Sequence, residues 1–506
     1  MRALATLPFP VLLAAVAALA MAVPALYGFA SGDRVAGWAF LSQGLLLLVL
    51  CAMIGLATAG DGRGARSPRV YLWGLLASLV GLPAALALPM AEAVPDTRFV
   101  NLYVEMVAAL TTTGGSVFAD PLARLGPTLM LWKALVAWLG GFLFWVAALA
   151  VFAPLDLGGF EIHASASDAR RARDARSGRS FGTDVAPRER LVRHAKALAP
   201  IYGGVTAVLA LGLALLGEPG LAAVVHAMSA ISTSGISVTG GMQGAAAGVP
   251  GEMLIFVFLF LAVSHVTFSG GRRALRPRVL LRDREVQVAL ICLAVLPVLL
   301  LLRHWVGALE FSEREDVATA LRVLWGGLFT TLSFMTTTGF VSTEWDVAQA
   351  WSGLSTTGLF LMGLALMGGG IATTAGGIKL LRVHALYKHG LREMERLTHP
   401  SSVGGAGPNA RRIRREGAFL AWVFFMLFLL SVVAVMAGLA LAGVGFVPAI
   451  TLAIAALSTT GPLAALGSVP MDTLGDGAKL VLAAAMVLGR VEALAILALV
   501  NPFVQR

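Results

Sequence analysis

The chain has 506 residues, of which 58% are hydrophobic and only 13% are charged, and its formal net charge is +10 at pH 7. Soluble globular domains carry about 25% charged residues, and a chain this apolar has too little polar material to cover a soluble surface. The composition therefore excludes an ordinary soluble domain and predicts a membrane protein.

Long apolar runs follow one another along the chain, each close to or above the length of about 20 residues that spans a bilayer as a helix. Helices are the expected spanning elements because hydrocarbon offers no partner for free backbone groups, and alternating β-barrel segments are absent. A second run closely follows the first, which favours a retained N-terminal hairpin in residues 1–60 over a cleaved signal peptide. The principal runs cover residues 11–30, 38–57, 70–89, 131–154, 253–268, 286–302 and 419–445.

Most basic residues gather in four blocks, within residues 63–69, 170–196, 272–284 and 379–415. All four blocks fall on one side of the membrane if the intervening segments are paired spans, and the positive-inside rule makes that side cytoplasmic. We therefore expect the N-terminus and the basic loops in the cytoplasm. The net charge reflects membrane orientation and does not indicate nucleic-acid binding.

A short string of Ser, Thr and Gly occurs four times, at residues 111–115, 232–236, 336–340 and 458–462. A long apolar span and a short amphipathic segment precede each string, and a second span follows it, so the repeating unit is span, pore half-helix, polar loop, span. The expected fold is an all-α membrane protein with ten transmembrane helices, in which four pseudo-repeats surround one pore and a hairpin precedes them. The expected boundaries are repeats at 70–154, 192–285, 286–397 and 413–506, with cytoplasmic linkers at 155–191 and 398–412.

The four strings have the chemistry of a cation pathway. Irregular backbone at membrane depth is tolerated where it is buried or lines a watery cavity, and rings of carbonyl oxygens can replace the hydration shell of an alkali cation. Glycine permits the alternating backbone dihedrals, threonine adds a hydroxyl acceptor, and the C-terminal end of each half-helix turns its negative dipole toward the ion. One string alone would favour helix packing, but four matched copies favour a pore. The predicted filter residues are Thr112, Thr113, Gly114, Thr233, Ser234, Gly235, Thr337, Thr338, Gly339, Thr459, Thr460 and Gly461.

Three further motifs accompany the strings: the segments 131–133 and 138–141 (Leu-Trp-Lys and Trp-Leu-Gly-Gly), the Gly-rich segment 368–379, and Gly-Arg-Val-Glu at 489–492. With the strings, they make nearly the whole chain resemble the Trk/Ktr/HKT superfamily of potassium transporters, and the N-terminal hairpin resembles its Trk branch. The resemblance implies potassium uptake across the bacterial inner membrane by channel-like permeation. An Na⁺-conducting or mixed Na⁺/K⁺ member of the same fold is the alternative, although all four strings keep glycine at the key position, which the resemblance associates with K⁺.

The same resemblance implies the partners. K⁺ is the transported ion, Rb⁺ is expected to permeate and Na⁺ to permeate more weakly. A homodimer, a cytoplasmic ring of nucleotide-binding regulatory subunits and the surrounding lipid are expected, with no covalent cofactor. A membrane enzyme would show clustered Asp, His or Glu at one membrane face, and a regulatory subunit with a dead pore would have lost a filter glycine. The sequence shows neither feature, so we expect a transporter and no enzymatic activity.

The Gly-rich segment at 367–377 interrupts the second span of the third repeat. Each glycine costs about 1 kcal/mol relative to alanine in a helix, so a regular helix is not expected there. A phosphate-binding loop would end in Gly-Lys-Ser/Thr and follow a soluble strand, and a close-packed kink remains an alternative. The resemblance implies a movable barrier under the filter, formed by Gly368, Gly369, Gly370, Thr373, Thr374, Gly376, Gly377 and Lys379, with Arg490.

Arg490 lies in an apolar span near Glu492. An isolated charge at membrane depth is a functional candidate, and the favoured interpretation places Arg490 in the cavity below the filter, facing the carbonyls of the loop. The alternatives are a structural ion pair with Glu492 or a side chain that reaches the cytoplasmic interface.

The remaining polar residues carry weaker signals. His226 and His265 flank the second string, and each is expected to pack between helices, because no second ligand stands at metal-binding spacing. Glu344 and Asp346 follow the third string and could concentrate cations at the outer mouth, or be ordinary solvated residues. Cys51 lies in an apolar run and is expected to be a packing residue, as is Cys292.

Overall fold

The computed structural model describes residues 8–58, 68–153, 187–263, 283–308, 317–353, 357–399, 415–467 and 471–492. Every regular element within these residues is a helix, which confirms the predicted all-α class. His265 lies outside the described residues, and so does the greater part of both expected cytoplasmic linkers and of the three basic blocks nearest the N-terminus.

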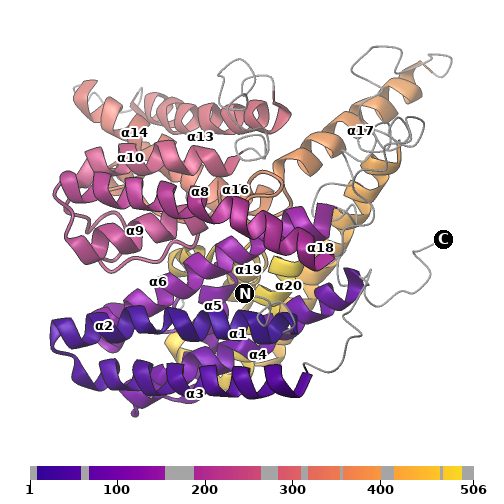
Figure 1. The fold of residues 1–506 in the computed structure, drawn as a ribbon. Coiled ribbons are helices and arrows are strands. Elements are labelled where there is room, and N and C mark those ends of the chain that lie inside the picture. The colour runs from indigo at the N-terminus through magenta and orange to yellow at the C-terminus, as the bar shows by residue number, and fades with distance from the viewer. Residues whose placement is uncertain are drawn as a thin grey trace.

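The N-terminal hairpin consists of an outgoing pair of helices, α1 (Phe9–Ala20) and α2 (Ala22–Ser31), and a returning helix, α3 (Arg34–Thr58). Gly32 ends α2 with a φ of +88°, a left-handed conformation that glycine adopts without a steric penalty. In Figure 1 these indigo helices lie along one side of the bundle, and α1 and α3 both pack on α4 (Pro68–Ala93). The hairpin therefore flanks the region expected to form the first repeat.

Four helices end directly at the four polar strings. They are α5 (Phe99–Leu110), α9 (Gly220–Ser232), α14 (Val317–Met335) and α19 (Phe446–Leu457). Three of them have 12 or 13 residues, too few to cross a bilayer, whereas α14 has 19. Each of the four turns its C-terminal end, and thus the negative end of its dipole, toward the string that follows.

Other helices flank these four. Pairs of them precede and follow each string: α4 and α6 (Pro121–Ala147); α8 (Pro187–Leu215) and α10 (Gly248–Leu259); α13 (Arg284–Ala308) and α16 (Thr357–Met367); α18 (Arg415–Leu441) and α20 (Asp476–Val491). A further short helix, α15 (Trp345–Ser352), follows the third string.

Eight helices in the described part of the chain are long and apolar enough to cross a membrane. One of them is α14, which precedes a string; the others include both arms of the hairpin. The remaining expected spans correspond to α10 and α20, which end beside undescribed residues, and to the interrupted helix α16. The count of ten spans therefore stays a prediction.

The interruption in the third repeat runs from the end of α16 at Met367 to the start of α17 (Leu380–Thr398). All twelve residues between these helices are buried, so this non-helical segment lies within the protein. Figure 1 shows α17, in orange, extending away from the bundle beside α18.

Candidate functional site

The four strings adopt the same backbone turn. The second residue of each string has a left-handed φ of 55° to 58°, an uncommon conformation for a β-branched residue; these residues are Thr112, Thr233, Thr337 and Thr459. The third residue of each string donates its backbone N–H to the carbonyl oxygen five residues earlier, in the helix that precedes it. In each string the hydroxyls of the first and third residues lie 2.9–3.1 Å apart and are hydrogen-bonded to each other.

The second hydroxyl of each string takes no part in this shared pattern, and its partner differs from string to string. Thr112 Oγ1 and Thr459 Oγ1 are buried and have no hydrogen-bond partner among the described residues. Thr233 Oγ1 donates to the carbonyl of Ser232, and Thr337 Oγ1 accepts from the backbone N–H of Gly376. Two buried oxygen acceptors are thus available to a cation.

The strings contact one another in chain order and close a ring. A Cβ added to Gly114 would lie 1.5 Å from Ser234 O, and one added to Gly235 would lie 2.1 Å from Thr338 O. A Cβ on Gly339 would lie 2.9 Å from the ring of Pro462, and the backbone N–H of Gly461 donates to Thr113 O at 2.7 Å. The ring runs from the first string to the second, third and fourth, and back to the first.

The fourth string differs from the other three in its glycine. Gly114, Gly235 and Gly339 have φ values of +74°, +68° and +81°, whereas Gly461 is not left-handed. It begins a 3-10 turn, Gly461–Gly467, in which the fixed φ of Pro462 suits a helical turn. The expectation that glycine supplies the unusual dihedral in every string is wrong for this one.

The Gly-rich loop between α16 and α17 lies directly against the ring. Gly376 N donates to Thr337 Oγ1 at 2.8 Å, and Thr374 Oγ1 donates to Ile231 O, in the last turn of α9, at 3.2 Å. A Cβ on Gly376 would lie 2.2 Å from Ser458 O. The loop therefore touches the chain at the second, third and fourth strings.

Ionic side chains fix the loop from the other side. Glu285 Oε1, on α13, accepts from the backbone N–H of Ile371 at 2.8 Å. Lys379 Nζ donates to Ala375 O, and Arg490 Nη1 donates to Thr374 O at 2.5 Å. In this loop, one backbone N–H thus donates to a carboxylate, and two backbone carbonyls accept from cationic side chains.

Arg490 is 6% exposed and its guanidinium lies 4.3 Å from the centre of the Phe144 ring. Its Nε and Nη2 have no hydrogen-bond partner among the described residues. Glu492 bonds with Arg382 at 2.8 Å, so the structure gives that carboxylate a different partner from the one that the ion-pair alternative requires. Arg490 and Lys379 both line a cavity of about 40 Å³ under the loop, large enough to hold water.

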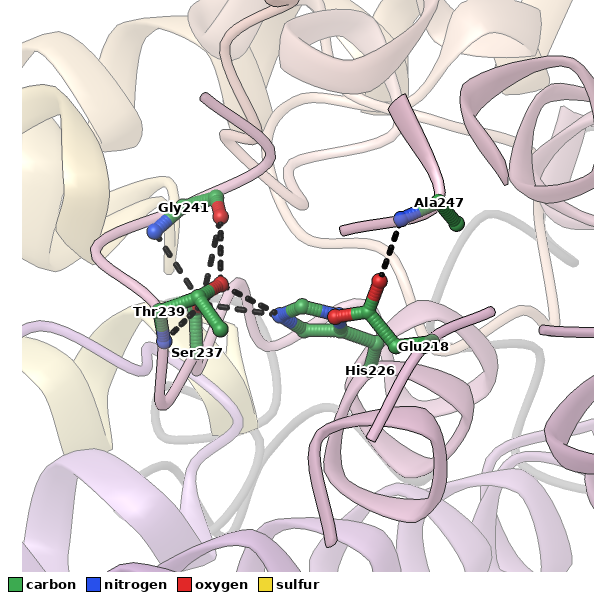
Figure 2. A network of polar contacts seen from close by, with 6 residues as sticks. All are labelled: Glu218, His226, Ser237, Thr239, Gly241 and Ala247. Atoms are coloured by element: carbon green, nitrogen blue, oxygen red, sulfur yellow. Dashed lines mark hydrogen bonds and ion pairs between the residues drawn. The ribbon is translucent and has the colours of Figure 1, made fainter. Parts of the chain in front are cut away.

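His226 is completely buried. Figure 2 shows it in a polar network with residues that follow the second string and with Glu218. Its Nε2 lies 2.8 Å from Ser237 Oγ and its Nδ1 lies 3.3 Å from Glu218 Oε1. The contact with His226 holds the pKa of the Glu218 carboxyl below its ordinary value, although burial opposes the shift. The described residues contain no group of three or more His, Cys, Asp or Glu arranged to hold a metal ion.

Sequence reasoning missed several buried ionic residues around the ring: Glu105, Glu218, Glu252, Glu285 and Arg382. For Glu105 and Glu252 the signal was present, because each is a single charge inside an apolar helix, which is costly and therefore a candidate for function. The two acidic residues at the expected outer mouth have protein partners: Glu344 pairs with Arg322 at 2.7 Å, and Asp346 accepts from Gln243 at 3.1 Å.

Residues 256–502 match the TrkH family, described as cation transport protein. The Trk system potassium uptake protein TrkI of Halomonas elongata is 29% identical over 97% of this chain and 94% of its own length. TrkH of Vibrio parahaemolyticus is 28% identical over 97% of both chains. The crystal structure of the potassium transporter TrkH from Vibrio parahaemolyticus superimposes with a TM-score of 0.80 over the whole of both chains, at 25% identity.

Proposed function

Because this chain belongs to the TrkH family of cation transport proteins, and is a multi-pass membrane protein, we propose that it takes up potassium through a single pore at the ring of four strings. The observation that carries this proposal is the closed ring in chain order, in which each string makes the same turn at the end of a helix. Four equivalent turns around one axis are what stacked rings of carbonyl ligands require.

The chemistry of the ring suits a monovalent cation. The four strings contain no Asp or Glu, and their oxygens are carbonyls and hydroxyls. The ends of four helix dipoles supply partial negative charge without a full counter-charge. The buried, unpartnered hydroxyls of Thr112 and Thr459 would gain a partner from an ion at the inner end of the filter. The filter ligands are then the twelve residues that the sequence predicted.

The Gly-rich loop would act as the gate. It bonds to Thr337 in the filter through Gly376 and is held there by Glu285, Lys379 and Arg490. The guanidinium of Arg490 keeps two donors without protein partners, so its positive charge is incompletely balanced and repels a cation that leaves the filter. Opening would require the loop to leave these contacts.

The cytoplasmic side would carry the regulatory contacts. α17 follows the loop directly, extends away from the bundle and exposes Tyr387, Met394 and Leu397. A partner that pulls on α17 would pull on the loop. We propose that this partner is the nucleotide-binding ring, that the chain works as a homodimer in the bacterial inner membrane, and that its N-terminus and basic loops are cytoplasmic.

Growth of a bacterial host that lacks its own potassium uptake tests this function. The intact chain should restore growth at limiting external K⁺, and a Gly114→Arg variant, which fills the ring, should not restore it despite equal membrane insertion. Failure of the inserted wild-type chain to restore growth, in the presence of its regulatory partner, would count against potassium uptake.

A further inference from the structure

Three of the four strings are followed by a serine in the same local arrangement. Each serine stands two or three residues after the filter glycine, and its Oγ accepts a hydrogen bond from the backbone N–H two residues further on. These bonds are Phe118 N to Ser116 at 3.2 Å, Thr239 N to Ser237 at 3.0 Å and Glu344 N to Ser342 at 3.2 Å. The accepted bond uses a lone pair of the serine oxygen, and the hydroxyl hydrogen remains available for a bond to another group.

Each hydroxyl meets a completely buried ionisable side chain that lies behind the string. The distances are 2.6 Å from Ser116 to Glu105 Oε1, 2.8 Å from Ser237 to His226 Nε2 and 2.7 Å from Ser342 to Glu252 Oε2. We call these three serine–acceptor pairs the outer braces. None of the six side chains belongs to the strings themselves.

The first brace reaches the backbone beside the filter glycine. Glu105 also accepts from Val117 N at 2.6 Å, and its Oε2 pairs with Lys133 Nζ at 2.5 Å. The same Lys133 Nζ donates to Gly115 O at 3.0 Å. The pair therefore holds both the residue that follows Gly114 and the segment beyond it.

The third brace joins two neighbouring repeats. Glu252 lies on α10, which precedes the third repeat, but its carboxylate accepts from Ser342 and from Thr343 N at 2.5 Å, both beyond the third string. Trp325 Nε1, on α14, donates to the same carboxylate at 2.9 Å. Three donors from two elements satisfy one buried charge.

The second brace uses an imidazole in place of a carboxylate, as Figure 2 shows. Ser237 Oγ accepts from Thr239 N and from Gly241 N, both at 3.0 Å, and lies 2.8 Å from His226 Nε2. His226 Nδ1 lies 3.3 Å from Glu218 Oε1, and the other oxygen of Glu218 accepts from Ala247 N at 2.9 Å. In the tautomer with its ring proton on Nδ1, His226 is an acceptor like the other two.

The fourth string has no brace of this kind among the described residues. The sequence after Gly461 is Pro-Leu-Ala-Ala-Leu-Gly, without a serine, and Gly461 N bonds directly to Thr113 O in the first string. The fourth segment is thus fixed by its contact with the first string, whereas the other three segments also contact the buried side chains of the outer braces.

We propose that Ser116, Ser237 and Ser342, with their buried acceptors, are positioning residues that fix three filter segments and so set the discrimination between K⁺ and the smaller Na⁺. This inference rests on the proposed potassium pathway. The serines act through the backbone, because selectivity requires carbonyls at fixed distances and each serine is at most three residues from a filter glycine. In the first and third braces the acceptor is a carboxylate, and buried bonds to a charged group are stronger than neutral ones, so these two segments are held most tightly.

The test uses S116A, S237A and S342A, singly and together, in the full-length chain reconstituted into lipid vesicles. The K⁺ to Na⁺ permeability ratio, from the reversal potential, should fall about threefold to tenfold for each variant and further for the triple variant. H226Q, which can accept from Ser237 and donate to Glu218, should keep the ratio better than H226L. S78A is the matched control, since Ser78 is buried and donates within its own helix α4, to Gly74 O at 2.7 Å.

The outcomes separate this inference from the proposed function. The inference would be overturned if the wild type selects K⁺ and all serine variants keep its K⁺ to Na⁺ permeability ratio, even where they conduct less. The serines would then have a structural role only. A wild type that does not discriminate K⁺ from Na⁺ would overturn the potassium filter, and the braces as selectivity residues with it.

Discussion

Arg490, in the last turn of α20, donates from Nη1 to the backbone carbonyl of Thr374 at 2.5 Å, although the two residues are 116 positions apart. The acceptor lies in the loop that interrupts the third repeat, and the donor lies on the final helix of the fourth. The loop needs such donors because its carbonyls have left the helical pattern. The bond therefore couples the position of this loop to a buried charge.

Replacing Arg490 by alanine should raise K⁺ flux by about tenfold, because a bond to a charged group stabilises its partner by more than about 1.4 kcal/mol. The K⁺ to Na⁺ ratio should stay unchanged, since the four strings keep their residues. Tracer flux into vesicles, corrected for the amount of inserted protein, measures both quantities.

The control for this variant is Arg396→Ala, because Arg396 is exposed on α17 and pairs with Glu393 of the same helix at 2.9 Å. Flux through that variant should equal wild type. An Arg490→Ala protein that folds and inserts normally but conducts no more than wild type would remove the barrier role from Arg490.

Glu285→Ala should also raise flux, by a few-fold, because it leaves the N–H of Ile371 without its acceptor and loosens the opposite side of the loop. Glu285→Gln retains a carbonyl oxygen and should stay close to wild type. Glu92→Ala, on the surface of α4 and bonded to Gln43, is the matched control and should have no effect. Equal flux in all four proteins would mean that the α13 contact does not hold the gate.

Serine in place of each filter glycine should lower the K⁺ to Na⁺ ratio for at least three of the four positions. Gly114 should be the most sensitive, since an added Cβ lies 1.5 Å from Ser234 O, and Gly339 the least, since its nearest neighbour is the Pro462 ring at 2.9 Å. Left-handed φ adds about 1–2 kcal/mol of strain at both positions. Reversal potentials of the reconstituted variants give the order.

Gly81→Ala is the matched glycine control, because a Cβ at Gly81 meets nothing within 4 Å and its φ is not left-handed. Its permeability ratio should equal that of the wild type. The filter geometry would be refuted by four glycine variants that all kept wild-type selectivity.

Lys133→Met should destabilise the protein by about 3–5 kcal/mol, because it leaves the Glu105 carboxylate buried and unpaired. Adding Glu105→Gln should recover part of the loss, since the second change removes the unpaired charge. The exposed pair of Arg124 and Asp96 provides the control, and Arg124→Ala should cost less than about 1 kcal/mol. Thermal unfolding in detergent measures these losses. Equal unfolding temperatures for Lys133→Met and Arg124→Ala would contradict the prediction.

The elements and strings could be predicted from the sequence because each depends on local pattern. Apolar runs of bilayer length predict the long helices, and the Ser/Thr-Gly strings mark where α5, α9, α14 and α19 end. The interruption after Met367 follows from glycine content. These features need no knowledge of how distant segments meet.

The ionic contacts could not be predicted, because they join residues that are far apart in the chain. Nothing in the apolar sequence around Glu252 indicates that its carboxylate will reach Ser342 in the next repeat. Glu492 was the obvious partner for Arg490 by proximity, yet it bonds to Arg382, 110 positions away. The turn at Gly461 depends on the first string, whose Thr113 carbonyl it meets.

Uptake of ⁸⁶Rb⁺ into proteoliposomes tests the central claim, that four strings form one potassium-selective pathway. The wild-type chain should accumulate ⁸⁶Rb⁺ down its gradient, external K⁺ should compete strongly, and Na⁺ and Li⁺ should compete weakly. Competition by Na⁺ as strong as that by K⁺ would contradict the account.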